Sequence, residues 1–383
     1  MVSSAAIISI DHYDNDLPLM LRPLLFTPAA AWLACALQDA GVERFLLLTQ
    51  PEWADQLTPC FPEGTQVAFR SDWEEAVRSF AAQSEGEIIT VTQPLWLSFG
   101  GAQLLTQLAA LPPAEEAPMG IFRHSAQALA ATGDLEGGAP FAPAMDDQPL
   151  VFPLTDALAL NSAQYFARME RAEQLMLQGV HILDPQSVYI DPAVTVGEGT
   201  VLLPNVILRG NTHIGAGCEI GPNTMIRDCT LGDGCVANSS QLNEAVFGCK
   251  VNIGPYAYVR PGTVVADGCK VGDFVEVKNA VIGKGTKLPH LIYVGDSDVG
   301  ERCNFGCGSI TCNYDGKNKH RTTVGDDVFI GCNTNLVAPV TVESGGFTAA
   351  GSTITDTVPA DGFAIARARQ VTRTDWKRPE KKQ

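Results

Sequence analysis

The segment IDPAVTVGEGTVLLPNVILRGNTHIGAGCEIGPNTMI, residues 190–226, decides how the second half of this 383-residue chain folds. An aliphatic residue occupies every sixth position in it, namely Ile190, Val196, Leu202, Leu208, Ile214, Ile220 and Ile226. A period of six fits neither the 3.6-residue repeat of an α-helix nor the alternation of an open strand. It is typical of a parallel β-helix built from hexapeptides, in which each aliphatic side chain points into a narrow core. We expect one such solenoid from about residue 191 to about residue 355.

The same repeat continues downstream at Ile253, Val259, Val265, Val271, Val277, Ile282, Leu288, Val294, Val324, Ile330, Leu336 and Val342. It is interrupted between about Cys303 and Thr323, where the sequence is polar and rich in glycine. An insertion in a solenoid leaves the stack as a loop, often on the face that binds a ligand. We therefore expect a functional loop in this stretch.

The first half of the chain alternates between strand-like and helix-like patterns. Short apolar runs at 5–10, 45–48 and 87–91 are typical of strands, and 29–40 and 71–82 have helical spacing. This alternation predicts an α/β, Rossmann-like domain with a mainly parallel sheet. Residues 111–149 are expected to form loops and short connections, and 156–177 a long helix that ends at Gly179. We predict four parts: an α/β domain at 1–155, a linker helix at 156–180, the β-helix at 181–365 and a basic tail at 366–383.

The formal charge of −17 is concentrated in the first half. The first 179 residues contain 7 Arg, no Lys and 22 acidic residues, which gives −15, and the remainder carries −2. Such an acidic front half argues against a nucleic-acid or anionic-membrane partner there. The sequence has no apolar run long enough to cross a bilayer and no secretory signal at its start, so we expect a cytoplasmic protein.

Eleven cysteines without a signal peptide are expected to be free thiols. Several, such as Cys218, Cys235 and Cys269, fall at positions of the repeat that require a small apolar side chain. Cys303, Cys307 and Cys312 have a spacing that matches no common zinc finger. We therefore predict no metal site.

Hexapeptide prisms serve in acyl transfer, in metal-dependent hydration or as scaffolds. Hydration needs three histidine ligands, and the separations of His213, His290 and His320 do not suggest a compact set. Acetylation of an amine needs a base, and a histidine near its ordinary pKa suits that task at neutral pH. His290 follows Pro289 inside the repeat, where a small residue would be usual. From the residues alone, a catalytic His290 and a hydrogen-bonded surface histidine both remain possible.

The region from about Gln178 to Gln383 resembles a known family. The resemblance is to the acetyltransferase half of the bacterial bifunctional (GlmU-type) glucosamine-1-phosphate acetyltransferase and N-acetylglucosamine-1-phosphate uridyltransferase. It is carried by the segments at 260–262 (RPG), 271–278 (VGDFVEVK), 289–296 (PHLIYVGD), 309–319 (SITCNYDGKNK), 324–331 (VGDDVFIG), 336–342 (LVAPVTV) and 376–382 (WKRPEKK). The family implies a left-handed β-helix that forms a homotrimer, with acetyl-CoA as the cosubstrate and each active site between subunits.

The family's site residues can be carried onto matching positions of this sequence. The resemblance implies that His290 is the proton acceptor from the amine of glucosamine 1-phosphate. It implies that Arg260 and Lys278 hold the sugar phosphate, that Tyr293 and Asn304 bind the sugar, and that Lys319 reaches across from a neighbouring subunit. The implied acetyl-CoA groove consists of Asn313, Tyr314, Cys307, Cys332, Ala350 and Arg367. Cys332 stands where the family has Ser and Cys307 where it has Ala, so the site is expected to be retained with slightly altered packing.

The front half departs from the family. Where the family has a Gly-rich phosphate-binding loop, this chain has Asp11, Asp14 and Asp16 and neither Gly nor Lys. Thr92 or Gln93 occupies the place of a metal-binding Asp, and Asn161 alone would hold Mg²⁺ poorly. We therefore expect a shortened, degenerate nucleotidyltransferase-like domain without bound Mg²⁺. The alternatives are a bifunctional enzyme that keeps UTP-dependent nucleotidyl transfer and a non-catalytic regulator that binds a sugar nucleotide.

Overall fold

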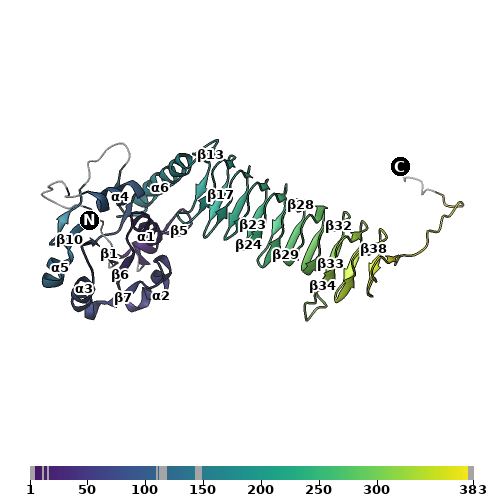
Figure 1. Ribbon diagram of the computed structural model, residues 1–383, viewed down its shortest axis with the longest axis horizontal. Coiled ribbons are helices and arrows are strands. Elements are labelled where there is room, and N and C mark those ends of the chain that lie inside the picture. The colour runs from purple at the N-terminus through teal and green to yellow at the C-terminus, as the bar shows by residue number, and fades with distance from the viewer. Residues whose placement is uncertain are drawn as a thin grey trace, which may run out of the picture. The chain divides into compact units, whose positions relative to one another are not determined.

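The structure is a computed structural model that describes residues 5–10, 13–14, 17–108, 111, 119–142 and 149–377. The chain forms two compact units, residues 1–213 and 214–383. The first contains an α/β sheet, a long helix and the opening strands of the β-helix, and the second contains the remaining coils and the tail (Figure 1). None of the helices in the described part has the length and apolar run that a membrane span requires. The four-part division predicted from the sequence remains a prediction.

The α/β part is a mixed sheet with helices on both faces. Its strand order is β11-β10-β8-β1-β6-β7, and β8, β1, β6 and β7 are parallel. These four follow the spatial order 3-2-1-4 of a doubly wound fold. The main elements are β1 (Ala5–Ser9), α1 (Ala29–Asp39), β6 (Arg44–Thr49), α2 (Ala54–Leu57), β7 (Gln66–Phe69), α3 (Trp73–Ala82), β8 (Glu87–Val91), β9 (Leu95–Leu97), α4 (Phe99–Gln107), β10 (Ile121–Ser125), α5 (Ala126–Thr132), β11 (Ala139–Pro140), β12 (Val151–Pro153) and α6 (Ala157–Leu177).

Alternate residues of the central strand β1 enter two separate cores. Ala6 and Ile8 pack with α1, α4 and α6, and Ala5 and Ile7 pack with α3 and α5. This two-sided burial explains the continuous apolar run of β1, because a parallel strand covered on both faces has no polar side. The small elements that complete this part are β2 (Tyr13–Asp14), β3 (Leu17–Pro18), β4 (Pro23–Leu24), β5 (Thr27–Pro28) and the 3-10 turns at Leu19–Leu21, Pro51–Trp53, Thr58–Cys60 and Arg70–Asp72.

The predicted connection at 111–149 is wrong in part. The structure places strand β10, helix α5 and strand β11 within it, and β10 pairs antiparallel with β8. Four of the five residues of β10 are buried, and Arg123 and His124 are among them. These polar residues concealed the strand, because an apolar run was the signal used to find strands. The other predicted helices and strands of the first half are present, and Gly179 follows α6 with a φ of 87°, as expected of a C′ glycine.

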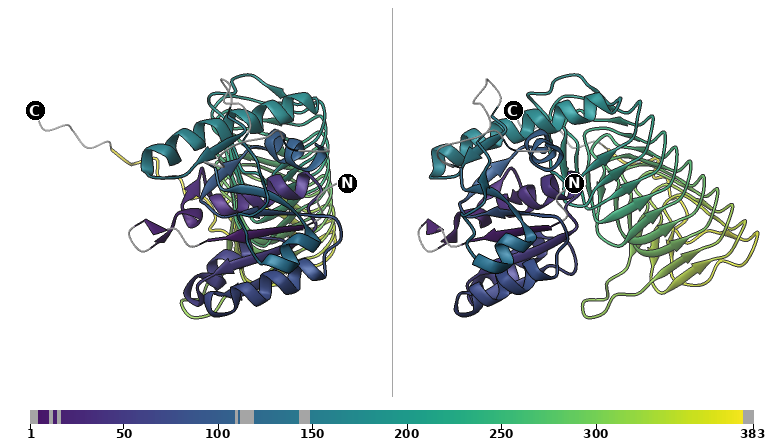
Figure 2. Two further views of the ribbon diagram at one scale, coloured as in Figure 1. Left: turned by 90° about the vertical axis from the view of Figure 1, so that its left-hand side faces the viewer. Right: turned by 60° about the vertical axis from the view of Figure 1, so that its left-hand side comes forward.

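The second half is a parallel β-helix, as the repeat predicted, and its coils stack one on another (Figure 2). One sheet has eleven strands: β13 (His181–Ile182), β16 (Val201–Leu202), β19 (Glu219–Ile220), β22 (Val236–Ala237), β25 (Asn252–Ile253), β28 (Lys270–Asp273), β30 (Lys287–His290), β32 (Asn304–Phe305), β35 (Phe329–Ile330), β38 (Phe347–Thr348) and β40 (Phe363–Ala364).

The other sheet of the β-helix has seventeen strands, because two sides of each coil contribute to it. They are β14 (Tyr189–Ile190), β15 (Thr195–Val196), β17 (Ile207–Arg209), β18 (His213–Ile214), β20 (Met225–Arg227), β21 (Thr230–Leu231), β23 (Gln241–Asn243), β24 (Ala245–Phe247), β26 (Tyr258–Val259), β27 (Thr263–Val265), β29 (Glu276–Ile282), β31 (Tyr293–Val299), β33 (Ile310–Cys312), β34 (Thr322–Val324), β36 (Asn335–Val337), β37 (Val340–Val342) and β39 (Thr353–Ile354).

The core of the β-helix consists of the periodic aliphatic residues and of cysteines. Ile220, Leu288 and Ile330 have no exposed surface, and Cys218 and Cys235 are buried with them. All eleven cysteines of the chain are free, which confirms the expectation of thiols.

The interruption of the repeat is shorter than the sequence indicated. Strands β32 and β33 continue the stack through 304–312, so that only residues 313–321 leave it as a loop (Figure 1). The sequence misplaced its start because Gly306, Cys307 and Gly308 occupy a corner of the coil and carry no aliphatic residue.

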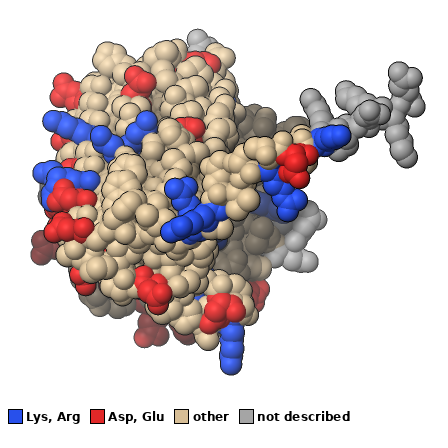
Figure 3. Space-filling view, turned by 90° about the vertical axis from the view of Figure 1, so that its right-hand side faces the viewer, with Lys and Arg blue, Asp and Glu red and all other residues tan. Residues whose placement is uncertain are grey.

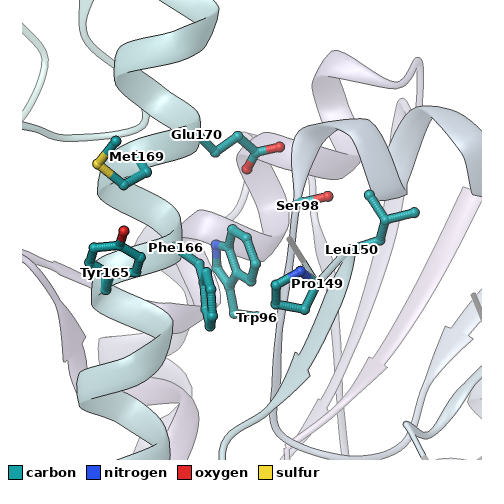
Figure 4. A pocket seen from close by; sticks show the side chains of 8 residues that line it. All are labelled: Trp96, Ser98, Pro149, Leu150, Tyr165, Phe166, Met169 and Glu170. Atoms are coloured by element: carbon teal, nitrogen blue, oxygen red, sulfur yellow. The ribbon is translucent and has the colours of Figure 1, made fainter. Parts of the chain in front are cut away.

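A cavity of about 230 Å³ lies in the first unit between α6, β9 and the start of α4 (Figure 4). Trp96 and Phe166 stack in it, and Glu170 of α6 lies at its upper end. The Glu170 carboxylate accepts a hydrogen bond from the backbone N–H of Gly100, at 3.2 Å, and its Oε2 has no hydrogen-bond partner among the described residues. Burial raises the pKa of Glu170 to about 7, although the backbone donors of Gly100 and Phe99 favour its ionised form.

This raised pKa predicts that the protein loses stability as the pH rises. The native state holds the Glu170 proton up to about pH 7, whereas the unfolded chain releases it near pH 4.5. The stabilisation is complete below pH 4.5 and is lost by about pH 7, for a total of about 3 kcal/mol. Urea unfolding at pH 4.5, 6 and 8 measures this slope, and Glu170→Gln should remove its share. Glu52→Gln, at an exposed position outside the cavity lining, is the control and should keep the slope. An unchanged slope in Glu170→Gln contradicts the prediction.

Candidate active site

One corner of the β-helix brings His290 into line with several predicted site residues. His290 is the last residue of β30, and Leu291 after it turns the corner with a φ of 55°. The next three coils turn at Gly308, Asn333 and Gly351, which also have positive φ. The residues directly before these turns are Cys307, Cys332 and Ala350. They occupy in their coils the place that His290 occupies in its own, and we call these four residues the corner column.

Backbone hydrogen bonds hold the corner column together. The N–H of Asn333 donates to the carbonyl of Cys307 at 2.8 Å, and that of Gly351 donates to Cys332 at 2.7 Å. Coils of a parallel sheet are about 4.8 Å apart, so the column descends about 15 Å from His290 to Ala350. Three of its four side chains are small.

The imidazole of His290 is half exposed and faces a carboxylate. Its Nδ1 lies 3.5 Å from Oδ1 of Asp273, and the two side chains are 50% and 40% exposed. Asp273 ends β28 in the preceding coil and is in register with His290. Sequence reasoning did not select Asp273, because an exposed aspartate beside a glycine corner is ordinary in hexapeptide repeats.

Three cations lie on or next to the adjoining sheet, and we call Arg260, Lys278 and Lys319 the cation group. Lys278 is on β29, and Arg260 follows β26 in the coil before it. The ammonium of Lys319, which faces Lys278, lowers the pKa of Lys278, and Arg260 acts in the same direction. Arg260 also donates to Glu276 at 2.7 Å, and this bond raises the pKa of Arg260. Like charges held this close favour the binding of an anion between them.

Lys319 joins this group from within the same chain, by way of the loop at 313–321. The carboxylate of Asp315 orders that loop, since it accepts from the backbone N–H groups of Asn318 and Lys317 at 2.6 and 2.8 Å. It also contacts Nε2 of His320 at 2.8 Å. These bonds, led by that from Asn318, hold the pKa of Asp315 far below its ordinary value. These bonds hold the loop in one conformation and therefore set the position of Lys319.

Asp296 of β31 connects the cation group to two other predicted residues. Its carboxylate accepts from the side-chain amide of Asn279 at 2.6 Å and from that of Asn313. Burial opposes its ionisation, but these amides and then Lys319 and Lys278 lower its pKa. A methyl group on Gly295 would collide with the hydroxyl of Tyr293 and approach the Asn313 amide, so the bare glycine lets both side chains lie over the strand.

The other predicted residues are distributed over the two sheets. Asn304 is on β32 of the eleven-stranded sheet, in register with Lys287 and Phe329, and not on the strands that carry the cation group. Tyr314 is 60% exposed on the loop, and its hydroxyl donates to Gly316. Arg367 follows β40, and its Cδ lies within van der Waals distance of the space beside Gly351, next to Ala350.

The structure thus divides the predicted residues into two neighbouring sets in the second unit. His290, Cys307, Cys332, Ala350 and Arg367 follow one corner, whereas Arg260, Lys278, Tyr293, Asn313 and Lys319 surround Asp296. Only two residues separate His290 from Tyr293 in the chain, which joins the sets. Asp296, Asp273 and Glu276 were missed as partners in the sequence, where the only signal was their place inside the family-like segments. In the described residues there is no grouping of three or more His, Cys, Asp or Glu suited to a metal ion.

Comparison with known proteins finds matches in the second half of the chain. Residues 193–228 match the family model for bacterial transferase hexapeptides (six repeats), and residues 221–308 match that for the GlmU-like, C-terminal hexapeptide. The C-terminal half of the chain is similar to GlmU. The bifunctional protein GlmU of Carboxydothermus hydrogenoformans is 48% identical over 232 residues, which is 61% of this chain and 52% of the relative. That of Geobacillus sp. strain WCH70 is 48% identical over 223 residues, or 58% and 49% of the two chains.

The chain spans about half the length of the curated GlmU relatives that it matches. Among solved structures, the UDP-N-acetylglucosamine acyltransferase of Francisella novicida aligns with 49% of this chain and 66% of its own, at 15% identity and a TM-score of 0.33. The GlmU resemblance itself, predicted from the sequence segments, is confirmed by the relatives.

The position of Asp296 predicts how the site responds to its loss. Asp296→Asn removes the charge between Lys278 and Lys319 and turns one acceptor oxygen into a donor that faces the amides of Asn279 and Asn313. A buried donor without an acceptor costs about 1–3 kcal/mol. We expect the free energy of unfolding to fall by that amount in guanidinium titration. Asp356→Asn, at an exposed position, is the control and should be neutral. Equal stability of the two variants contradicts the assigned role.

Proposed function

We propose that this chain transfers an acetyl group from acetyl-CoA to the amine of glucosamine 1-phosphate. The observation that carries the proposal is the juxtaposition of the His290 corner with the cation group, which offers a base beside a site for a phosphate. The similarity to GlmU supports it, since residues 221–308 match the GlmU-like, C-terminal hexapeptide model.

The proposed chemistry needs one base and no redox partner. The lone pair of the substrate amine attacks the thioester carbonyl carbon, a C–N bond forms, and the C–S bond then breaks. Nε2 of His290 takes the proton that the nitrogen loses and delivers it to the departing thiolate, so the imidazole is restored. A histidine is suited to both steps because its ordinary pKa lies near neutrality.

The cation group is proposed to bind the sugar phosphate. A phosphate dianion between Lys278 and Lys319 would relieve the repulsion of their ammonium groups, and Arg260 can present N–H donors to its oxygens while it holds Glu276. Tyr293 and Asn313 lie beside this group. In this proposal Tyr293 contacts the sugar ring, and Asn313 keeps the place in the acetyl-CoA groove that the resemblance implies. Asn304 lies on the other sheet. In this proposal it contacts the sugar where the ligand extends around the corner between the two sheets.

The corner column is proposed to hold the acyl donor. Cys307, Cys332 and Ala350 are small side chains in line with His290, and Arg367 and exposed Tyr314 supply a cation and an aromatic ring. Lys and Arg side chains also stand on the extended C-terminal segment (Figure 3). An elongated thioester with phosphates at its far end fits this sequence of groups.

We propose a homotrimer, since the same corner is apolar and exposed in the coils that lead up to His290. Tyr256 and Phe274 stack there, with centroids 5.3 Å apart, and Leu291 follows in the next coil. They are 61%, 57% and 56% exposed. Phe274 and Leu291 directly follow Asp273 and His290. A neighbouring copy over this ridge would therefore enclose the site.

The first unit is proposed to lack uridyltransferase activity. Thr92, after β8, is tied to Gly120, since its N–H donates to that carbonyl at 2.8 Å. A hydroxyl in this place supplies no charge for a metal ion. The loop aspartates Asp11 and Asp16 and the side chain of Asp14 lie outside the described residues, so the expected repulsion of a triphosphate remains a prediction.

The proposal predicts that His290→Ala lowers the turnover of acetyl transfer at least about a hundredfold. The loss should fall on kcat, because the imidazole acts in the proton transfer and not in binding. His181→Ala, at an exposed histidine in the first coil, is the control and should keep wild-type rates. Thiol release from acetyl-CoA with glucosamine 1-phosphate measures the reaction, and wild-type turnover in His290→Ala contradicts the role.

An assay of pyrophosphate release with N-acetylglucosamine 1-phosphate, UTP and Mg²⁺ tests the first unit. We expect no release of pyrophosphate. Release at a rate comparable to acetyl transfer would favour the bifunctional alternative.

A further inference from the structure

We infer that Asp273 is a positioning residue for His290 and that the two side chains form a carboxylate–imidazole pair. The inference rests on the proposed function for its effect on turnover. It rests on the geometry of the two strands for the pair itself. The carboxylate faces Nδ1, which leaves Nε2 as the nitrogen available to a substrate proton.

The backbone of this step of the β-helix fixes the pair. Asp273 of β28 and His290 of β30 are partners in register, and the N–H of Leu291 donates to the carbonyl of Asp273 at 2.9 Å. On the other side of the pair, Gly272 lies directly against Pro289. A methyl group on Gly272 would collide with the Pro289 carbonyl oxygen, so only glycine allows this approach. Contacts on both sides therefore hold the two side chains in adjacent coils, about 4.8 Å apart along the stack.

The corner geometry directs both side chains the same way. Phe274 and Leu291, the residues after the pair, turn with φ values of 56° and 55°. Because the two corners have the same conformation, the preceding residues leave their strands in parallel. The 3.5 Å separation is at the outer limit of a hydrogen bond, and contacts of this kind shorten when a substrate occupies the site.

The expected effect follows from the roles of the two imidazole nitrogens. A carboxylate at Nδ1 keeps the proton on that nitrogen, so that Nε2 presents a lone pair, and it stabilises the imidazolium formed after proton transfer. Asp273→Asn removes the charge and can turn an N–H toward Nδ1, which favours the opposite tautomer. The substitution should therefore lower kcat and leave KM for the sugar phosphate unchanged.

The test combines kinetics with a spectroscopic readout that needs no activity. In the full chain with ¹⁵N-labelled histidine, two-dimensional NMR should show the neutral ring of His290 with its proton on Nδ1, and His290→Ala assigns the signal. Asp273→Asn should shift that signal toward the other tautomer. It should also lower kcat at least about tenfold. Asp356→Asn is the control for a carboxylate lost elsewhere on the β-helix.

The outcomes separate the pair from the proposed reaction. Acetyl transfer by the wild type with an unchanged tautomer and kcat in Asp273→Asn overturns the pair and leaves the function standing. Absence of acetyl transfer in the wild type overturns the function, and the tautomer measurement then decides the pair by itself. A His290 signal protonated on Nε2 in the wild type overturns the pair in either case. Thermal unfolding of Asp273→Asn near the wild-type temperature excludes a loss through misfolding.

Discussion

Backbone hydrogen bonds between successive coils determine where every side chain of the candidate site stands. The bond from Leu291 to Asp273, and those from Asn333 to Cys307 and from Gly351 to Cys332, lock each coil onto the one before it. Residues far apart in the sequence thereby become neighbours at a spacing set by the sheet and not by their own contacts. The loop at 313–321 lies between Cys307 and Cys332 in the chain, yet it does not disturb their register, because it leaves the stack from the strand end of β33.

The same constraint explains which features could be predicted from the sequence. A period of six records the core of the β-helix, since each inward position must be aliphatic or small, and the strands therefore follow from the pattern. The position of each residue within its coil also follows from the repeat. The resemblance could therefore assign Cys307, Cys332 and Ala350 to one groove before the structure showed them in line. Contacts between outward side chains leave no such record. In the sequence, Asp273 and Asp296 are polar residues without an identifiable partner, and only the register of β28 with β30 and the path of the 313–321 loop give them partners.

In the α/β part, prediction succeeded where all buried residues of a strand are apolar and failed where some of them are polar. Strand β1 is apolar throughout because helices cover both faces of it. Strand β10 lies beside β8 near the sheet edge and carries Arg123, whose guanidinium donates to the carbonyls of Leu105 and Leu108 at 3.0 and 2.7 Å. Those bonds satisfy a buried charge that sequence reasoning assigns to a loop. The sequence contains no sign of the two carbonyls that make this burial tolerable.

The electrostatics of the second unit depend on how like charges are kept together. Lys278 and Lys319 repel each other, and three arrangements hold them in place: Asp296 between the strands, the Asp315 bonds that stiffen the loop, and the ion pair of Arg321 with Asp298 at 2.5 Å near the end of the loop. Each of these carboxylates already has its own donors, so none is free to neutralise the two ammonium groups fully. The excess positive charge therefore stays directed at solvent. A fold that required only stability would have no reason to keep it there, whereas a site for an anionic substrate must carry that charge before the substrate arrives.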